Sequence, residues 1–527
     1  MYVIGGLGDQ IAFYVWPKIS ETFFRIANAH IANHLPYRDI FQGFTAPWFS
    51  TQPLLWTPVS LLLTIFGVNF IIFFILFTTI LNLYCSYLLF RRFRFWLFYS
   101  LIFAFSSFYF LHLGPHMDLM QLWVFPLFMH FYLTIHRDQR FRFSKSIFLG
   151  LYILLVFLIS NYFALYIAIF YVLLSIIGYL IRRFFRFKPD QRRLGGMLIS
   201  IVTVGLLVLS GYVFLKKNKL LMEVSTRSYE DYFVFSSRPW YFVLPSPKNP
   251  LLGNISNRAY RLIDNTGYFL ADDYFHLEHS ANYLGMLFLI TCTFFGVFAF
   301  KKSKQKTKSA LLIYLFVCLS VFFLTMPPYF TLLGVRIYTP GQLLYMFFPL
   351  FRVTARMSVL IHLGLLLLCA TSVDALVRLK LVNSKYVKTF LSIVLVVTMT
   401  EVYIPPKILK FDKEPEVYKS LGLLGKTSSR FAVYPYSKTR EALFWLPVHQ
   451  KLLINMREYS DEDVVSVEFT ERLPTDSGVK DFGDMGGEYL VVFKNIPEAD
   501  LVFFKNNDAL ELVGDYSDSY LFTYRVR

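Results

Sequence analysis

The chain has 527 residues, of which 56% are hydrophobic and only 17% are charged, and its mean hydropathy of +0.49 excludes an ordinary soluble globular protein. The net charge of +17 would suit a nucleic-acid-binding protein, but the basic residues gather in short clusters between long apolar runs. Because cytoplasmic loops of membrane proteins are rich in Lys and Arg, this charge reflects topology, and we predict a polytopic membrane protein without a nucleic-acid partner.

The first 52 residues contain no apolar run long enough to span a membrane. They open with MYVIGGLGDQ, which is similar to the exit from a membrane helix, so we expect either a truncated start or a chain that begins outside. Between Ile11 and Ala32 the apolar residues recur at roughly helical spacing, which predicts an amphipathic helix on the outer membrane surface. Asp9 precedes this helix, where its carboxylate could act as a general base, bind a divalent metal or cap the helix.

Apolar runs in the rest of residues 1–404 predict about ten membrane spans. Where basic clusters flank one long run on both sides, the chain must cross the membrane twice, so 95–136 and 146–181 are predicted helical hairpins. The other predicted spans are 68–90, 194–215, 282–300, 309–325, 357–376 and 389–404, and the long outer-face loops are 1–52, 216–281 and 326–356.

The turn of the first hairpin carries polar side chains between two apolar runs, in the stretch FYFLHLGPHMDLMQLWVFP. A Gly-Pro step marks the turn, which places His112, His116, Asp118 and Gln121 at or just inside the outer membrane surface. The two histidines and the aspartate resemble a partial set of metal ligands. Polar side chains that satisfy one another at an interface would fit the pattern equally well.

Two further outer loops carry ionisable residues just before a predicted span. Glu278 precedes the span at 282–300, and an ionisable group at such a boundary indicates a functional site. Arg352 and Arg356 lie four residues apart in FRVTARM, on one face of a predicted helix. Forked guanidinium groups bind phosphate well, which favours a lipid phosphate as ligand, whereas snorkelling to the membrane interface is the alternative.

The composition changes after residue 404. Acidic residues outnumber basic ones in 405–527, and short alternating runs replace the long apolar ones. The fold class is therefore mainly α, a transmembrane bundle over 1–404, with a soluble extracytoplasmic domain of α/β or α+β type over 405–527. LFWLPVHQKLLI is the best helical candidate in this domain. The predicted strands are Arg430–Tyr434, Glu488–Phe493, Glu511–Gly514 and Tyr520–Val526.

The order of the motifs is also informative. GLGDQIAFYVW is followed by TQPLLWTPVSLLLTIFGVN, the FAFSSFYFLHLGPHMDLMQLWVFPLF hairpin, ANYLG and LFRVTARMSVL. This order resembles the bacterial and archaeal polytopic membrane glycosyltransferases with the GT-C fold, over nearly the whole chain. This sequence contains no counterpart of the helix that normally precedes the first outer loop in that family, which agrees with the expectation of a truncated start or a chain that begins outside.

The resemblance implies a plasma-membrane enzyme that takes a sugar from a polyprenyl-phosphate-linked donor. It would transfer the sugar, with inversion, to an unidentified acceptor on the outer face. In this family an acidic residue of the first outer loop is the catalytic base, and the matching position here is Asp9. We assign Arg352 and Arg356 to the donor phosphate, because cations at the membrane boundary stabilise the departure of an anionic leaving group.

The second outer loop in several members of the family binds a metal or the donor phosphate. By resemblance, that role falls to His112, His116 and Asp118, with a divalent cation such as Mg or Mn, and Gln121 and Glu278 are further outer-face candidates. The alternative is a transporter or a non-catalytic protein of envelope polysaccharide assembly. A transporter would place ionisable residues near the bilayer midplane, whereas the polar residues here lie at the outer boundary.

Overall fold

The computed structural model divides the chain into two compact units, which are described separately. One comprises 51–55 and 73–406, and the other comprises 1–50, 56–72 and 407–527. The structure describes residues 2–4, 70–113, 118–137, 143–187, 195–206, 229–264, 277–332, 335–348, 351, 353–406, 408–410, 415–425, 429–449, 451–455 and 462–525.

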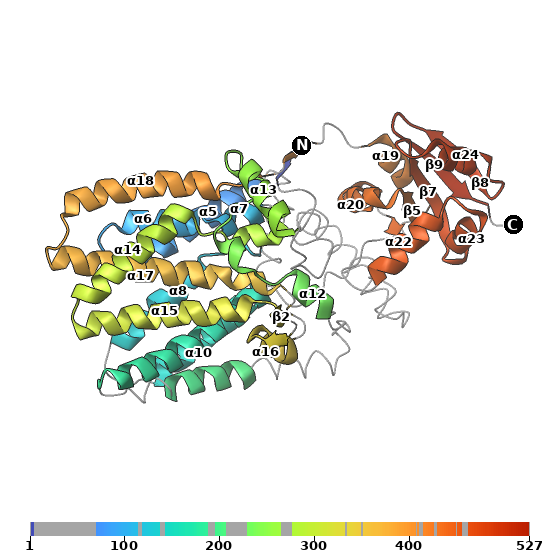
Figure 1. Ribbon diagram of the computed structural model, residues 1–527. Coiled ribbons are helices and arrows are strands. Elements are labelled where there is room, and N and C mark those ends of the chain that lie inside the picture. Colours follow the sequence, from blue (N-terminus) through green and yellow to red (C-terminus); the bar gives the residue numbers. More distant parts are fainter. Residues whose placement is uncertain are drawn as a thin grey trace. The chain divides into compact units, whose positions relative to one another are not determined.

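The first unit is a bundle of helices, with short helices and one hairpin at one of its ends (Figure 1). Its long helices are α5 (Phe70–Phe90), α6 (Trp96–Ala104), α8 (Val124–Arg137), α9 (Phe143–Phe157), α10 (Asn161–Phe184), a helix over 195–206, α14 (Met286–Lys302), α15 (Gln305–Thr325), α17 (Ser358–Arg378) and α18 (Ser384–Val402). The short elements are α7 (Ser107–His112), α12 (Tyr229–Val234), η1 (Pro239–Phe242), α13 (Gly253–Asp264), η2 (Leu277–Asn282), β2 (Tyr329–Leu332), β3 (Val335–Tyr338), α16 (Gly341–Phe347) and η3 (Thr354–Met357).

Within the described residues, five helices are long and apolar enough to cross a membrane, so the chain is a multi-pass membrane protein. They are Ile72–Phe90, Asn161–Phe184, Glu278–Lys302, Gln305–Thr325 and Thr354–Arg378. Shorter apolar helices occupy most of the other predicted spans. The two predicted hairpins are present as α6, α7 and α8, and as α9 and α10, the latter pair turning at 158–160 as expected.

The span Thr354–Arg378 is the most enclosed of the five. In its most apolar stretch 83% of the residues are buried, compared with 28% in that of α15. Gly364 allows α15 to approach closely, because a Cβ there would lie 2.4 Å from Cys318 Sγ. His362 and Asp374 of α17 are both buried, so protein rather than lipid surrounds these ionisable groups.

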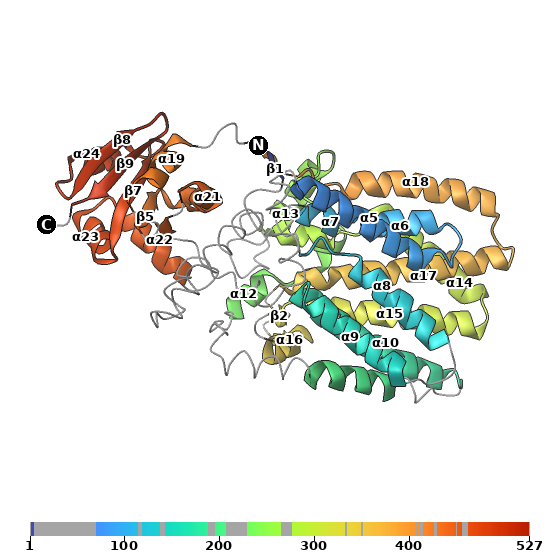
Figure 2. The same ribbon diagram turned by 180° about the vertical axis from the view of Figure 1, so that it is seen from behind.

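Basic residues mark one end of the bundle, which we call the basic end. The turn between α14 and α15 and the turn between α17 and α18 lie there side by side (Figures 1 and 2). Lys301 and Lys302 end α14, and Arg378 ends α17. The opposite end carries α7, α12, α13 and α16, and we call it the loop end.

The second unit contains a five-stranded mixed sheet of order β6-β5-β7-β9-β8. β5 is parallel to β6 and β7, whereas β9 is antiparallel to β7 and β8. Strands occupy all four predicted stretches. The bounds are β5 (Arg430–Tyr434), β6 (Leu452–Leu453), β7 (Gly487–Phe493), β8 (Leu510–Asp515) and β9 (Ser519–Tyr524).

Helices cover the two faces of this sheet (Figure 2). Alternate residues of β5 and β7 enter two separate cores, so Phe431 and Val433 pack on one face and Ala432 on the other. This arrangement explains why the central strands are apolar throughout. The helices are α19 (Glu416–Leu423), α20 (Thr439–Phe444), α21 (Leu446–His449), α22 (Glu462–Arg472), α23 (Asp476–Asp484) and α24 (Glu498–Asn506), with η4 at Tyr436–Lys438; a separate pair, β1 (Tyr2–Ile4) and β4 (Ile408–Lys410), is antiparallel.

The prediction of one helix over LFWLPVHQKLLI is wrong. The stretch contains the end of α20, the four-residue α21 and the strand β6. Pro447 lies in the first turn of α21, where its missing N–H is tolerated, but it cannot continue a helix that begins earlier. Pairing of β6 with β5 supplies backbone partners that a helical conformation would not have reached.

His449 is a buried pH-sensitive group of this unit. Its Nε2 donates to the carbonyl oxygen of Ala442 at 2.9 Å, and its Nδ1 accepts from the Lys451 N–H at 3.1 Å. The neutral ring satisfies both partners, and burial lowers the pKa of His449 to about 4. Because the unfolded chain takes up this proton near pH 6.5, the group stabilises the fold above that pH and destabilises it as the pH falls toward 4.

We expect protonation of His449 to lower the free energy of unfolding of the second unit by about 3 kcal/mol when the pH falls from 7 to 4. Hydrogen exchange of the β5 and β7 amides in the full-length protein, measured at both pH values, reports this loss. His449→Gln keeps a donor for Ala442 but cannot be protonated, so its loss over the same interval should be smaller by that amount. An equal loss in the wild type and the variant would exclude His449 as the sensitive group.

Candidate functional site

A buried carboxylate, that of Glu278 in η2, is the centre of the candidate site. Arg356 donates to both of its oxygens, from Nε to Oε2 at 3.0 Å and from Nη2 to Oε1 at 2.7 Å. His112 Nε2 lies 3.1 Å from Oε2, and all three side chains are at least nine-tenths buried. The structure thus joins α7, η2 and η3, which are distant in the sequence, through one ion-pair cluster at the loop end.

The ring of His112 faces two hydrogen-bond acceptors. Nδ1 lies 2.7 Å from the carbonyl oxygen of Phe108, one turn earlier in α7, and Nε2 faces the Glu278 carboxylate. A hydrogen bond at each nitrogen requires a proton on each, so the imidazolium form satisfies this geometry. Among the described residues, Arg356 and the His112 ring therefore share the one carboxylate of Glu278.

The guanidinium of Arg356 stacks on an aromatic ring. Its central carbon lies 5.2 Å from the ring centroid of Tyr162 in α10, within the range of a cation–π interaction. Tyr166, one turn further along α10, donates to the carbonyl oxygen of Val353 at 3.0 Å and so holds the backbone just before η3. Arg356 Nη1 makes no hydrogen bond to the described part of the chain, which leaves a donor for a ligand.

Backbone contacts hold η2 in place beside α7. Ser107 Oγ donates to the carbonyl oxygen of Tyr283 at 2.6 Å and lies 3.1 Å from that of Ala281. On the other side, Asn282 Nδ2 donates to Ser237 Oγ at 3.0 Å. Glu278 is therefore set on a rigid turn, as a preorganised site requires.

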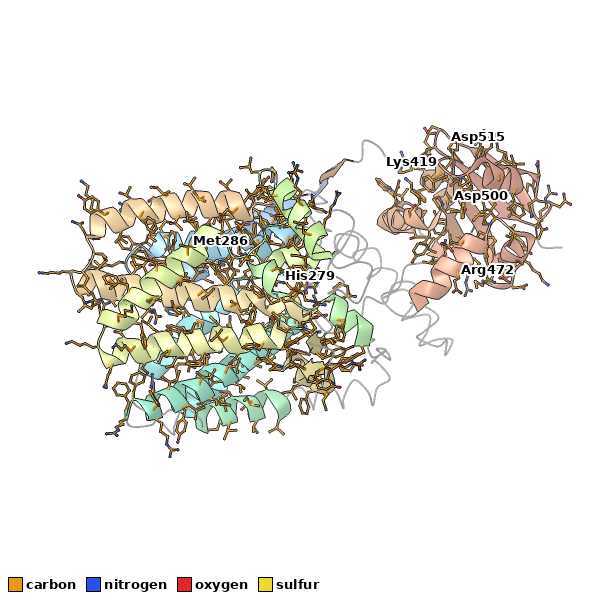
Figure 3. All side chains as sticks on the ribbon, viewed as in Figure 1. His279, Met286, Lys419, Arg472, Asp500 and Asp515 are labelled. Carbon is orange, nitrogen blue, oxygen red and sulfur yellow. The ribbon has the colours of Figure 1, made fainter. Side chains whose placement is uncertain are left out.

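His279, the neighbour of Glu278, is labelled in Figure 3 and contacts a different segment at the loop end. Its ring stacks on Tyr241 with centroids 4.2 Å apart, and its Nε2 donates to the carbonyl oxygen of Val234 at 2.8 Å. Burial raises the pKa of Tyr241 to about 12, so its hydroxyl stays protonated at neutral pH. His279 is thus a structural contact between η1, α12 and η2.

Sequence reasoning missed Tyr162 and Arg238. Arg238 donates from Nη1 and Nη2 to carbonyl oxygens, among them that of Phe233 at 3.1 Å, and burial lowers its pKa to about 10. The scarcity of arginine on the outer side of membrane proteins could have drawn attention to RPWYF. Tyr162 has no such signal, because one aromatic residue among many in an apolar run looks like core.

The other predicted residues have separate surroundings or lie outside the described residues. Asp118 lies 3.5 Å from Ser160 Oγ at the turn between α9 and α10. Gln121 is buried, accepts from Trp123 Nε1 at 2.9 Å and donates to Thr78 at 3.4 Å. The residues outside the described ranges are Asp9, His116 and Arg352.

Two predicted residues have backbone or side-chain contacts that bear on their roles. Arg356 lies in η3, which begins at Thr354, and Val353 before it has non-helical angles of φ −92° and ψ 74°. Nδ1 and Nε2 of His112 face a carbonyl oxygen and a carboxylate, and its role as a metal ligand stays a prediction. Among the residues that the structure describes, no group of three His, Cys, Asp or Glu side chains is placed to hold a metal ion.

The chain was compared with known proteins. No family model and no curated protein matches the sequence. The cryo-EM structure of the arabinofuranosyltransferase AftD from mycobacteria matches with a TM-score of 0.52 and 11% identity, over 93% of this chain and 36% of AftD. A structure of mutant AftD matches with a TM-score of 0.54 and 12% identity, over 89% of this chain and 36% of AftD.

The crystal structure of ArnT from Cupriavidus metallidurans bound to undecaprenyl phosphate gives a TM-score of 0.38 and 9% identity, over 90% of this chain and 88% of ArnT. The chain spans about a third of the length of AftD, and the similarity at this identity is one of fold. The chain therefore shares the fold of the part of AftD that it covers.

Proposed function

We propose that the protein is a membrane glycosyltransferase that moves a sugar from a polyprenyl-phosphate-linked donor to an acceptor on the outer face of the plasma membrane. The observation that supports this proposal is the Arg356–Glu278–His112 cluster at the loop end of a GT-C fold. The proposed topology has about ten spans, with the basic end cytoplasmic and residues 405–527 extracytoplasmic, because Lys and Arg concentrate in cytoplasmic loops.

The guanidinium of Arg356 and the ring of His112 suit an anionic ligand. Glu278 engages Nε and Nη2 of Arg356 and so orients its guanidinium, while Nη1, which has no partner in the described part of the chain, could donate to a phosphate oxygen. His112 adds charge from the other side of the carboxylate. Charge-assisted hydrogen bonds are strong in a water-poor setting, so the cluster would stabilise the negative charge that grows on the departing lipid phosphate.

In the proposed inverting step, an acceptor oxygen attacks the anomeric carbon from the side opposite the phosphate. The new C–O bond forms as the bond between the anomeric carbon and the phosphate oxygen breaks, and the lipid phosphate leaves with that electron pair. Asp9 takes the acceptor proton. Arg352 is proposed to contribute to phosphate binding, and His116, Asp118 and Gln121 to surround the donor.

The proposal is tested by transfer of labelled sugar from polyprenyl-phosphate donors by the purified protein in proteoliposomes. Arg356→Lys keeps the charge but loses the fork, so the KM for the donor should rise about 10- to 100-fold with a smaller change in kcat. Arg336→Lys is the matched control, because Arg336 is exposed on β3 and also stacks on a tyrosine, Tyr329, at 5.0 Å.

The control variant should transfer sugar like the wild type. Equal donor KM values in both variants and the wild type would remove Arg356 from the donor site. Absence of transfer by the wild type with every polyprenyl-phosphate donor tested would favour the alternative, a non-catalytic role or transport in envelope polysaccharide assembly.

A further inference from the structure

A cavity of about 310 Å³ lies at the basic end of the bundle, at the opposite end from the Arg356 cluster. The α14–α15 turn and the last turn of α17 form its walls. Its lining residues are Phe93, Ser303, Lys304, Thr307, Thr371, Asp374, Ala375, Arg378 and Leu379. The function proposed above uses none of them.

The cavity contains an unused hydrogen-bonding group. Ser303 is 8% exposed and lines the cavity, yet its Oγ has no hydrogen-bond partner among the described residues. A buried hydroxyl without a partner destabilises the fold, so such a group points to a ligand that satisfies it. Thr307 of α15 and Thr371 of α17 add two more hydroxyl groups to the cavity lining, and the N-terminal turn of α15 begins at Gln305.

Positive charge is in excess around this cavity. Asp374 accepts from Arg378 Nη2 at 2.6 Å and lies 3.9 Å from Arg94 Nε, so one carboxylate faces two guanidinium groups. Lys304 lines the cavity without an acidic partner among the described residues. The free N–H groups and positive dipole of the α15 N-terminus add to this charge. The hydroxyl groups and the excess positive charge of this cavity therefore suit a phosphate-bearing anion.

We propose that this cavity binds the headgroup phosphate of an anionic lipid from the leaflet at the basic end. The apolar surface beside it favours a lipid over a soluble phosphate, because Leu379 on the cavity wall is 40% exposed and Val297 of the adjoining α14 is 51% exposed. Exposed apolar side chains such as these can contact the acyl chains of a lipid. The headgroup would accept hydrogen bonds from the Ser303 hydroxyl and from Lys304, and basic pockets between membrane helices bind anionic lipids in this way.

The first test uses Ser303→Ala in detergent, with thermal unfolding measured as phosphatidylglycerol is added. In lipid-free detergent the variant should be at least as stable as the wild type, because the lost hydroxyl has no protein partner. Phosphatidylglycerol should raise the Tm of the wild type through binding to the folded state, and raise that of the variant less. A purely structural serine would show the reverse pattern, a lower Tm without lipid and an unchanged lipid effect.

The second test compares two lysines of one turn by native mass spectrometry of lipids retained from nanodiscs. Lys304→Ala should weaken phosphatidylglycerol retention about fivefold. Lys306→Ala removes the same charge outside the cavity, and this variant should retain phosphatidylglycerol like the wild type. Equal losses of phosphatidylglycerol retention in the two variants would show that the lipid is attracted only by surface charge and would overturn the proposed site. Protection of the protein by glycerol phosphate or inorganic phosphate, without lipid, would overturn the lipid assignment. Neither variant touches the Arg356 cluster, so sugar transfer reports the proposed function separately.

Discussion

Glu278→Gln should destabilise the helical unit by about 3–5 kcal/mol, because it leaves Arg356 and His112 buried without their shared carboxylate. Two cations would then repel each other in a site from which water is largely excluded. Unfolding in mixed micelles of a mild detergent and SDS measures the loss. Sugar transfer should also fall, since the guanidinium loses the partner that orients it.

Two further variants separate this explanation from simple loss of packing. Arg356→Met leaves Glu278 paired with the His112 imidazolium, so it should cost less stability than Glu278→Gln. The double variant Glu278→Leu with Arg356→Met replaces the ion pair with apolar groups and should recover most of the stability, while transfer stays lost. If Glu278→Gln unfolds like the wild type, the carboxylate is not the partner on which the two cations depend.

Asp9→Asn should reduce sugar transfer by about 100- to 10,000-fold, the usual contribution of a positioned general base. Asparagine keeps the size of the side chain and its ability to cap a helix, so stability should change little. The measurement is kcat for transfer in proteoliposomes, with thermal unfolding alongside. Asp9 itself lies outside the described residues, so the assignment depends on the family resemblance of GLGDQ.

Asp39→Asn serves as the control for Asp9→Asn, because it removes a carboxylate from the same first segment at a position to which no role is assigned. It should leave transfer intact. Wild-type transfer by Asp9→Asn at unchanged stability would remove Asp9 from the catalytic role, whereas a joint loss of transfer and stability would indicate that capping is its main duty.

Much of the fold can be predicted from the placement of basic residues and from the apolar periodicity of the sequence. Basic residues on both sides of the run at 146–181 require a hairpin, and α9 and α10 form it. Alternation in 430–434 and 488–493 predicts strands, and both stretches form inner strands of the sheet, β5 and β7. Local pattern fails at 443–454, where pairing of β6 with β5 decides the structure, because a partner strand distant in the sequence cannot be read from periodicity.

The site was predictable in part only. Ionisable residues at the ends of apolar runs are costly, so His112, Glu278 and Arg356 could each be selected from the sequence. The contacts between these three side chains could not be predicted, because they depend on how α7, η2 and η3 meet in space. The partners of the two His112 nitrogens could not be predicted for the same reason, since they are a carbonyl in its own helix and a carboxylate 166 residues away.

The enclosure of the span Thr354–Arg378 has a consequence for biogenesis. This segment contains Arg356, His362 and Asp374, which would be expensive to expose to hydrocarbon one by one. Synthesis proceeds from the N-terminus, so α10, α14 and α15 are complete before this segment leaves the ribosome. The helix can therefore enter a membrane in which its protein neighbours are already present, and its polar residues need never cross bare lipid.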